Sequence, residues 1–270
     1  LRREKLAKKI RSRKFFIAPG VFDMLSARVA DKFNFDALYM TGYGAVASYL
    51  GLPDAGLASY RDMVNRVSTI ASGISKPLIA DADTGYGGLL NISQTIKGYE
   101  SSGACALHIE DQVNPKKCGY TKNKELVSKD HMCKRLKVAL DSREDNNFLI
   151  IARTDSLSEE GILNACKRSE AYINTGVDML FVEGFETVEE MKEITENFKN
   201  IPLMINLSES GNTPKLSAKE LKELGFTLAI FPGTAFSASA AAMDMVYKKI
   251  FTDNSSSEIS IPLIKGMDMH

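Results

Sequence analysis

The sequence lacks the features of a secreted, membrane-bound or nucleic-acid-binding protein. Its four cysteines form neither a CxxC metal-ligand pair nor the dense framework of a small disulfide-stabilised domain. The charges of its 34 basic and 34 acidic residues cancel, so the net charge does not indicate binding to nucleic acid or to an anionic membrane. No apolar run approaches the roughly 20 residues of a membrane span, and the start shows no signal-peptide pattern. We therefore expect a reducing, cytoplasmic location without a nucleic-acid or membrane partner.

What the sequence does contain is a repeated alternation of short apolar runs and stretches with helical spacing. At 270 residues and 44% hydrophobic, the chain can bury a substantial core. Strands separated by helical crossovers pair in parallel, and this length matches the roughly 250 residues of an eight-fold α/β barrel. The expected strands cover residues 15–18, 37–40, 78–82, 106–111, 148–153, 179–183, 202–206 and 227–231. The expected helices between and after them cover residues 23–33, 60–71, 92–103, 129–142, 159–175, 188–197, 218–224 and 238–251.

Two architectures fit this alternation, a closed (β/α)8 TIM barrel and a doubly wound open sheet. The barrel is favoured because polar residues follow the expected strands consistently, and in a barrel those strand ends converge on one mouth. We expect one α/β barrel domain over residues 1–270 with a C-terminal helical extension over about residues 238–270. The polar residues at the strand ends are Asp81, Asp83, Glu110, Arg153, Glu183 and Asn206.

The carboxylates Asp81 and Asp83 end the third expected strand, before a glycine-rich turn. A charge is costly to bury unpaired, so they need a basic partner or a divalent cation, unless they cap the following turn and helix. Glu110, at the end of the next strand, favours the cation because a third carboxylate would otherwise add repulsion. Oxygen ligands select Mg²⁺ or Mn²⁺ rather than zinc. The histidines His108 and His131 stand alone in the sequence, and we expect both to be structural.

A second candidate group is the thiol of Cys118, which follows Lys116 and Lys117 in a loop bounded by proline and glycine. Two neighbouring lysines can lower a thiol pKa from its usual value of roughly 8.5, which makes the group a better acid or nucleophile. The alternative is that both lysines face solvent and the thiol fills a gap.

Arg153 ends a strongly apolar strand, where a charged side chain is expected only if it meets an anion. It can pair with Asp155 or Glu183 within the protein, or it can bind a substrate carboxylate through two hydrogen bonds. Both interpretations stay open from the sequence. Further hydrogen bonds near this strand end can come from Asn206, Glu209 and Thr213.

Six motifs together resemble the isocitrate lyase and phosphoenolpyruvate mutase superfamily over nearly the whole chain. They are YMTGYG at 39–44, LGLPD at 50–54, DADTGYG at 81–87, IEDQ at 109–112, PKKCG at 115–119 and ARTD at 152–155. The compact length resembles the branch that contains 2-methylisocitrate lyase, 2,3-dimethylmalate lyase, oxaloacetate hydrolase and carboxyphosphonoenolpyruvate phosphonomutase.

This resemblance implies a Mg²⁺-dependent enzyme. Asp81 and Asp83 would hold the ion, partly through water, with Asp54 and Glu110 around it, and Cys118 resembles the catalytic cysteine of the lyases. The resemblance also implies that Tyr39, Thr41, Gly42 and Tyr43 border the bound 2-oxo acid, with Arg153 on its carboxylate and Glu183 and Asn206 nearby. We expect Lys117, Arg153 and Tyr39 to act in catalysis, and we count Gly119, Tyr120 and Glu209 among the substrate-binding residues.

The implied reaction is cleavage of a C–C bond in a 2-hydroxy or 2-oxo di- or tricarboxylate such as 2-methylisocitrate or dimethylmalate. The products would be a 2-oxo acid such as pyruvate and a carboxylate. Family members that act on phosphonopyruvate lack the Lys-Lys/Arg-Cys-Gly signature, so residues 116–119 favour C–C cleavage. The lyases commonly have histidine at the position of Tyr120, and we expect this difference to affect which substrate is used.

Two alternatives to the C–C lyase remain. One is a P–C bond enzyme that acts on a carboxyphosphonoenolpyruvate-like substrate, and the other is a barrel that binds a 2-oxo acid without turnover. The resemblance also implies a homotetramer, a dimer of dimers in which the C-terminal helix is exchanged between subunits.

Overall fold

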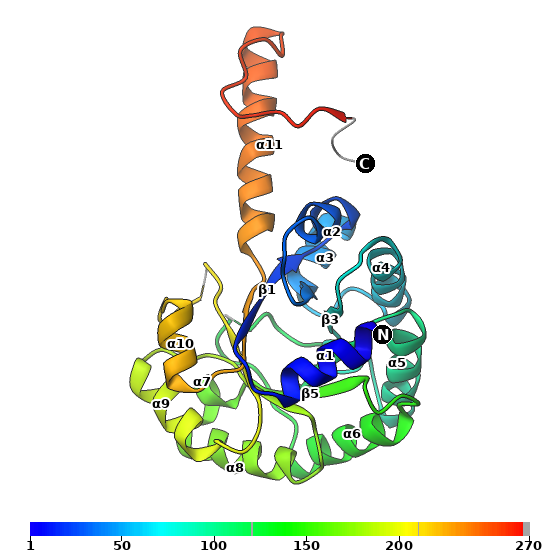
Figure 1. Ribbon diagram of the computed structural model, residues 1–270, viewed down its shortest axis with the longest axis vertical. Helices are drawn as coiled ribbons and strands as arrows, with labels where there is room; N and C mark the ends of the chain where they lie inside the picture. Colours follow the sequence, from blue (N-terminus) through cyan, green and yellow to red (C-terminus); the bar gives the residue numbers. More distant parts are fainter. Residues whose placement is uncertain (120, 210, 267–270) are drawn as a thin grey trace.

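The computed structural model describes residues 1–119, 121–209 and 211–266, so the prediction for Tyr120 lies outside the described residues. Within these ranges, parallel strands close into a barrel in chain order, with β8 hydrogen-bonded back to β1 (Figure 1). The predicted (β/α)8 barrel is therefore confirmed and the open sheet is excluded. The strands are β1 (Phe16–Val21), β2 (Leu38–Met40), β3 (Leu78–Asp81), β4 (Ala106–Glu110), β5 (Leu149–Thr154), β6 (Met179–Val182), β7 (Leu203–Asn206) and β8 (Leu228–Phe231).

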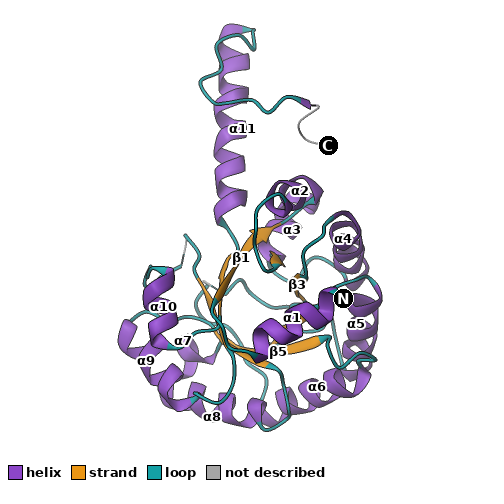
Figure 2. Cartoon of the chain, in the orientation of Figure 1, coloured by secondary structure: helices purple, strands orange, loops and turns teal. Residues whose placement is uncertain are grey.

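The helices ring the barrel, and α1 (Arg2–Arg11) lies across one end of it (Figure 2). Leu6 and Ile10 of α1 are buried in the same cluster as Phe16, the first residue of β1, so α1 closes the end from which the strands start. The opposite end, where the strands finish, stays accessible. The helices that follow are α2 (Met24–Asp31), α3 (Gly42–Leu50), α4 (Tyr60–Gly73), α5 (Leu89–Ser101), α6 (Lys129–Ser142), α7 (Ser156–Glu160), α8 (Ile162–Ile173), α9 (Val188–Asn197), α10 (Ala218–Leu224) and α11 (Thr234–Asp253).

Two helical segments differ from the sequence prediction. The helix α3 was not predicted, because glycines at positions 42 and 44 disfavour a helix interior. It forms because the Thr41 side chain caps its first turn, accepting a hydrogen bond from the Gly44 N–H. The single helix expected over residues 159–175 is divided into α7 and α8. Gly161, whose φ of +77° lies in the left-handed region, separates them.

The last helix, α11, projects away from the barrel (Figure 1) and has no buried residue. It includes the predicted helix at 238–251 and begins before it. Exchange of this helix between subunits stays a prediction. None of the helices within the described residues is both long and apolar enough to cross a membrane.

The closure of the barrel by α1 can be tested with two leucine truncations. Leu6 is 1% exposed, whereas Leu163 on α8 is 71% exposed. We expect Leu6→Ala to lower the free energy of unfolding by about 2–5 kcal/mol, because it leaves a cavity under the barrel. Leu163→Ala should change it by less than about 0.5 kcal/mol. Urea unfolding measures both, and similar losses in the two variants would show that α1 does not seal the core.

Candidate active site

Polar side chains gather at the end of the barrel where the strands finish. Asp81, Glu110 and Asn206 are the last residues of β3, β4 and β7, and these three side chains are buried. Phe181 and Pro232 also lie here, but apolar residues at strand ends carry no chemical signal in the sequence. The pocket at this end is lined by Tyr39, Thr41, Tyr43, Asp54, Asp81, Cys118, Gly119, Arg153, Phe181, Glu183, Asn206 and Pro232.

Lys116 lies among the carboxylates of this site. Its Nζ is 2.6 Å from Asp54 Oδ1 and 3.0 Å from Asp83 Oδ1, and the residue is only 3% exposed. The interpretation that this lysine faces solvent is therefore wrong. Burial alone would lower the pKa of Lys116, but Asp83, Glu110 and Asp54 raise it well above its usual range. Lys116 is thus an ammonium ion that compensates two of the predicted metal-site acids.

His108 is a site residue that the sequence analysis treated as structural. It is fully buried, its Nε2 lies 2.8 Å from the Tyr39 hydroxyl, and the same atom is 3.6 Å from Asp81 Oδ1. Burial lowers the pKa of His108 to about 4, so the imidazole is neutral at pH 7. A sequence signal did exist, since His108 and Glu110 are two residues apart on one strand and share a face. His131, in contrast, is exposed on α6.

The acids and the imidazole fit a divalent cation. Asp81, His108 and Glu110 each offer one ligand atom, and these atoms lie within 4.8 Å of one another. Glu110 is fully buried, neither of its oxygens accepts a hydrogen bond within the described structure, and burial raises its pKa well above the usual range. Carboxylate oxygens with one imidazole nitrogen suit Mg²⁺ or Mn²⁺. A cation here would stabilise the carboxylate form of Glu110.

Gly42 brings the N-terminus of α3 close to these acids. A Cβ atom at Gly42 would lie 2.5 Å from Asp81 Oδ2, so another residue at this position would clash. The first turn of a helix presents free backbone N–H groups, which favour an anion. The helix cap Thr41 lines the pocket, so this helix end is placed to receive a carboxylate.

Arg153 pairs with several buried acids at once. Its Nε and Nη2 donate to the two carboxylate oxygens of Asp155 at 3.1 and 2.9 Å, and its Nη1 is 3.3 Å from Glu110 Oε2. Glu183 Oε2, which accepts a hydrogen bond from Asn206 at 3.0 Å, lies 4.0 Å away. The internal ion pair with Asp155 is therefore present, and Arg153 also lines the pocket. These contacts hold the guanidinium in one orientation.

A buried hydrogen-bond network supports this orientation from behind. Asp111 accepts hydrogen bonds from the Thr154 hydroxyl at 2.7 Å, the Tyr172 hydroxyl at 2.8 Å and the Asp155 backbone N–H at 2.9 Å. Asp111 therefore fixes the backbone of Asp155, the residue whose carboxylate pairs with Arg153. Asp111 lies within the IEDQ motif but received no role from the sequence.

The loop after β4 brings Cys118 to the pocket. The Gln112 side chain accepts from the Lys117 backbone N–H at 2.9 Å and donates to the Lys117 carbonyl at 3.0 Å. The Lys117 ammonium points elsewhere, since it is exposed and donates to the Asn123 carbonyl. Lys116, rather than Lys117, is thus the lysine that enters the site.

Two further hollows adjoin this pocket. Exposed Glu209, which accepts a hydrogen bond from Thr234, lines one of them together with Cys118 and Tyr43. Buried Thr213 lines the other, together with Glu183, Gly119 and residues of α7. The predicted binding residues Glu209 and Thr213 therefore lie beside the pocket rather than in its lining.

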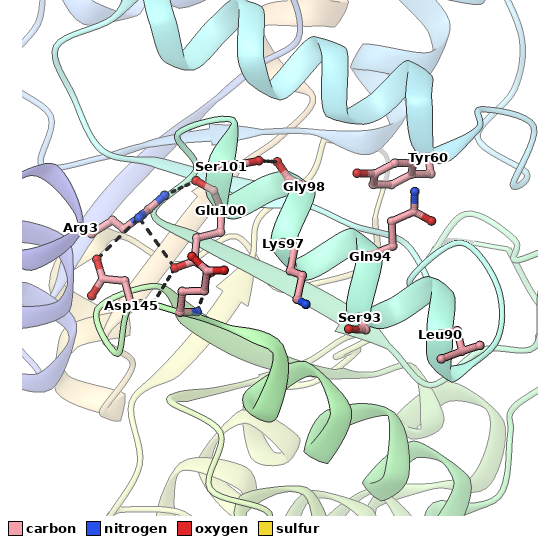
Figure 3. Close-up of a pocket in the computed structure, with 11 residues that line it drawn as sticks. Arg3, Tyr60, Leu90, Ser93, Gln94, Lys97, Gly98, Glu100, Ser101 and Asp145 are labelled. Carbon is pink, nitrogen blue, oxygen red and sulfur yellow. Dashed lines mark hydrogen bonds and ion pairs between the residues drawn. The ribbon is translucent and has the colours of Figure 1, made fainter.

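A wide surface hollow lies elsewhere, between α1, α4, α5 and the segment after α6 (Figure 3). Arg3 Nη1 is 3.8 Å from Glu100 and 3.6 Å from Asp145, so its charges already compensate one another (Figure 3). None of the predicted site residues lines it. The barrel mouth remains the candidate active site.

Comparison with known proteins gives matches over most of the chain. Residues 6–251 match the family model described as phosphoenolpyruvate phosphomutase. The 2,3-dimethylmalate lyase of Eubacterium barkeri is 39% identical over 255 residues, which cover 94% of this chain and 88% of that protein. The 2-methylisocitrate lyase of Aeropyrum pernix is 37% identical over 250 residues, covering 93% and 80%.

Solved structures are similar over almost the whole chain. Oxaloacetate acetylhydrolase in complex with the inhibitor 3,3-difluorooxalacetate has a TM-score of 0.94 at 33% identity, covering 98% of this chain and 91% of that one. Phosphonopyruvate hydrolase in complex with oxalate and Mg²⁺ has a TM-score of 0.90 at 27% identity, covering 99% and 93%.

The hydrogen-bond network that supports Arg153 can be tested by removing Asp111, which accepts its hydrogen bonds. We expect Asp111→Ala to lower the free energy of unfolding by about 3–5 kcal/mol, because buried donors lose their carboxylate and Arg168, 3.6 Å away, loses one ion-pair partner while it keeps Glu160. The control is Asp141→Ala on the exposed face of α6, with an expected change below about 0.5 kcal/mol. Urea unfolding compares them, and an equally small loss in both would contradict a supporting role for Asp111.

Proposed function

Because this chain belongs to the phosphoenolpyruvate phosphomutase family and is a lyase related to the methylisocitrate and dimethylmalate lyases, we propose that it cleaves a C–C bond in a 2-hydroxy or 2-oxo di- or tricarboxylate. The products would be a 2-oxo acid, such as pyruvate, and a second carboxylate. The observation that carries this proposal is the position of Cys118, whose thiol shares one pocket with Asp81 and Arg153. A proton donor, the Cys118 thiol, and a group that can bind an anion, the Arg153 guanidinium, thus border the same space as acids suited to a metal.

In this proposal the acids at the barrel mouth hold Mg²⁺ or Mn²⁺. The ligand atoms come from Asp81, Glu110 and His108, with Asp83 and Asp54 close by. When bound, the ion supplies Lewis-acid stabilisation of the negative charge that develops on the oxygen of the 2-oxo acid. The Mg²⁺ and oxalate in the phosphonopyruvate hydrolase structure support such a site here.

The protein groups then bind the substrate and move protons. The N-terminus of α3, beginning at Gly42, and the side chains of Thr41, Tyr43 and Tyr39 border the 2-oxo acid part. Arg153, oriented by Asp155, binds the carboxylate of the 2-oxo acid part. Smaller contacts to the substrate come from Gly119, Glu183, Asn206 and Glu209.

Bond cleavage needs one proton to be removed and one to be supplied. A base takes the proton of the substrate hydroxyl, whose oxygen becomes the new carbonyl as the electron pair of the C–C bond moves to the leaving carbon. The Cys118 thiol donates its proton to that carbon and becomes a thiolate, which is reprotonated before the next turnover. The carbanion is thereby neutralised before the products separate.

A second candidate function is P–C bond chemistry on a phosphonopyruvate-like substrate. It is favoured by the similarity to phosphonopyruvate hydrolase, whose structure contains Mg²⁺ and oxalate in an equivalent fold. The same cation site would serve both reactions. The Lys-Lys-Cys-Gly sequence at residues 116–119 is the reason for preferring C–C cleavage.

The role of the thiol is tested by Cys118→Ser. We expect turnover to fall by about 10²–10⁴-fold, because serine is a far weaker acid, while the affinity for Mg²⁺ and oxalate is retained. Release of pyruvate or oxalate from methylisocitrate, dimethylmalate and oxaloacetate measures turnover, and calorimetry measures binding. Cys133→Ser, which alters a half-buried cysteine on α6, is the control. Unchanged turnover in Cys118→Ser would remove the thiol from the mechanism, and phosphonopyruvate consumption seen by phosphorus NMR would favour the second function.

We also propose a homotetramer in which one barrel domain per chain exchanges α11 with a neighbour. On α11, Tyr247 is 66% and Phe251 is 85% exposed. Leu25, Val29 and Phe33 are also exposed and lie at intervals of four residues on and just after α2, which gives an apolar stripe of helical spacing. Apolar surface of this extent favours burial between subunits. None of the four cysteines forms a disulfide in the described structure, which supports the proposed reducing, cytoplasmic location.

The proposed assembly is tested by placing charges on α11. We expect the double variant Tyr247→Asp and Phe251→Asp to dissociate the tetramer, because buried carboxylates would face apolar surface. Lys248→Asp, at a position on the same helix that is exposed and polar, should leave the assembly intact. Light scattering coupled to size-exclusion chromatography gives the mass. A monomeric wild-type protein would overturn the exchange.

A further inference from the structure

The ammonium group of Lys116 lies among the acids that surround the proposed cation site. Its ammonium contacts Asp54 Oδ1 at 2.6 Å and Asp83 Oδ1 at 3.0 Å, with side-chain exposures of 2% for the lysine and 6% for each acid. Such short, water-excluded ion pairs are strong only while both partners stay in place. The lysine therefore compensates carboxylates that surround the proposed cation ligands Asp81 and Glu110.

Lys116 is also part of the short segment that carries Cys118. The backbone between them is constrained, because the Gln112 side chain forms two hydrogen bonds with the backbone of Lys117. Beyond the cysteine, a Cβ atom at Gly119 would lie 2.7 Å from Arg153 Nη2, so the chain passes directly over the arginine. The hydrogen bonds of Gln112 thus hold the short piece of backbone that joins Lys116 to a thiol two residues away.

A divalent cation held by Asp81 and Glu110 would lie in the same group of buried acids as the ammonium of Lys116. The charges repel, and the low effective dielectric of a buried site strengthens that repulsion. The Oδ1 atoms of Asp54 and Asp83 that form ion pairs with Lys116 also cannot turn toward an ion or its water ligands without giving up the lysine. Cation binding and the docked position of Lys116 therefore oppose each other.

We propose that Lys116 is a positioning residue that couples the cation site to the Cys118 segment. A bound divalent cation weakens the contacts of Lys116 with Asp54 and Asp83 and so releases residues 116–119, and docking of this segment weakens cation binding by the same factor. This reciprocity is required by thermodynamic linkage. The inference rests on the cation site of the proposed function but assigns Lys116 a role that the lyase reaction does not require.

The coupling has a consequence for the order of events. Without a cation, Lys116 compensates the acids and holds the thiol at the mouth of the barrel. Once the ion takes over that compensation, the segment can move and open the pocket to the substrate, and it can return when the substrate carboxylates add negative charge. Cation loading therefore precedes substrate entry.

The first test uses the wild-type protein. Alkylation of each cysteine by iodoacetamide is followed by mass spectrometry with and without Mg²⁺, under conditions in which calorimetry shows binding. We expect Mg²⁺ to accelerate alkylation of Cys118 by about tenfold, within the usual range of coupling between sites. Cys105, Cys133 and Cys166 serve as internal references whose rates should not change. An unchanged or slower reaction of Cys118 in the Mg²⁺-bound protein overturns the coupling.

The second test removes the ammonium with Lys116→Met. We expect this variant to bind Mg²⁺ about tenfold more tightly than the wild type and to alkylate rapidly at Cys118 with or without the ion. The matched control is Lys122→Met, which removes an exposed positive charge from the same loop and should alter neither quantity. Equal Mg²⁺ affinity in Lys116→Met and the wild type overturns the inference while leaving the cation site intact. Failure of both proteins to bind Mg²⁺ overturns the cation site and the inference together.

Discussion

The constraint on which this site depends is the burial of several carboxylates at one end of the barrel. Asp54, Asp81, Asp83 and Glu110 are all less than 8% exposed. A buried ion without compensation costs several kcal/mol, so the fold can hold this group only with positive charge close by. Lys116 and Arg153 supply part of it, and in the function that we propose a divalent cation supplies the rest. The buried acids thus favour the binding of a metal ion. They also bind Lys116, and in our proposal its positive charge opposes that ion.

The closed parallel barrel is what brings these acids together. Its strands are covered on both faces, by the barrel interior and by the surrounding helices, so they appear in the sequence as continuous apolar runs. For the same reason, their positions could be predicted from the sequence, and so could the convergence of polar residues at the strand ends. The neighbouring positions of Asp81 and Glu110 follow from the pairing of β3 with β4. That pairing requires only that consecutive parallel strands lie side by side.

The details that the sequence did not provide depend on register and on local backbone direction. The register of β3 and β4 pairs Asp81 with His108, which places the imidazole beside the acid and the Tyr39 hydroxyl. No pattern within a single strand reveals such a pairing. Likewise, consecutive side chains in an extended segment point in different directions, so only one of Lys116 and Lys117 can enter the site. The hydrogen bonds of Gln112 to the Lys117 backbone decide which one.

The fold itself does not decide which bond is broken. The structure superimposes on 2,3-dimethylmalate lyase with a TM-score of 0.94 and on phosphonopyruvate hydrolase with one of 0.90, so one barrel carries both kinds of enzyme. A buried cation and an arginine can stabilise an oxyanion next to either a C–C or a P–C bond. P–C cleavage must pass a phosphoryl group to an acceptor oxygen, whereas in the proposed C–C cleavage no such transfer occurs and the leaving carbon needs a proton. In the function that we propose, Cys118 supplies that proton from the segment that also carries Lys116, whose ammonium contacts Asp54 and Asp83.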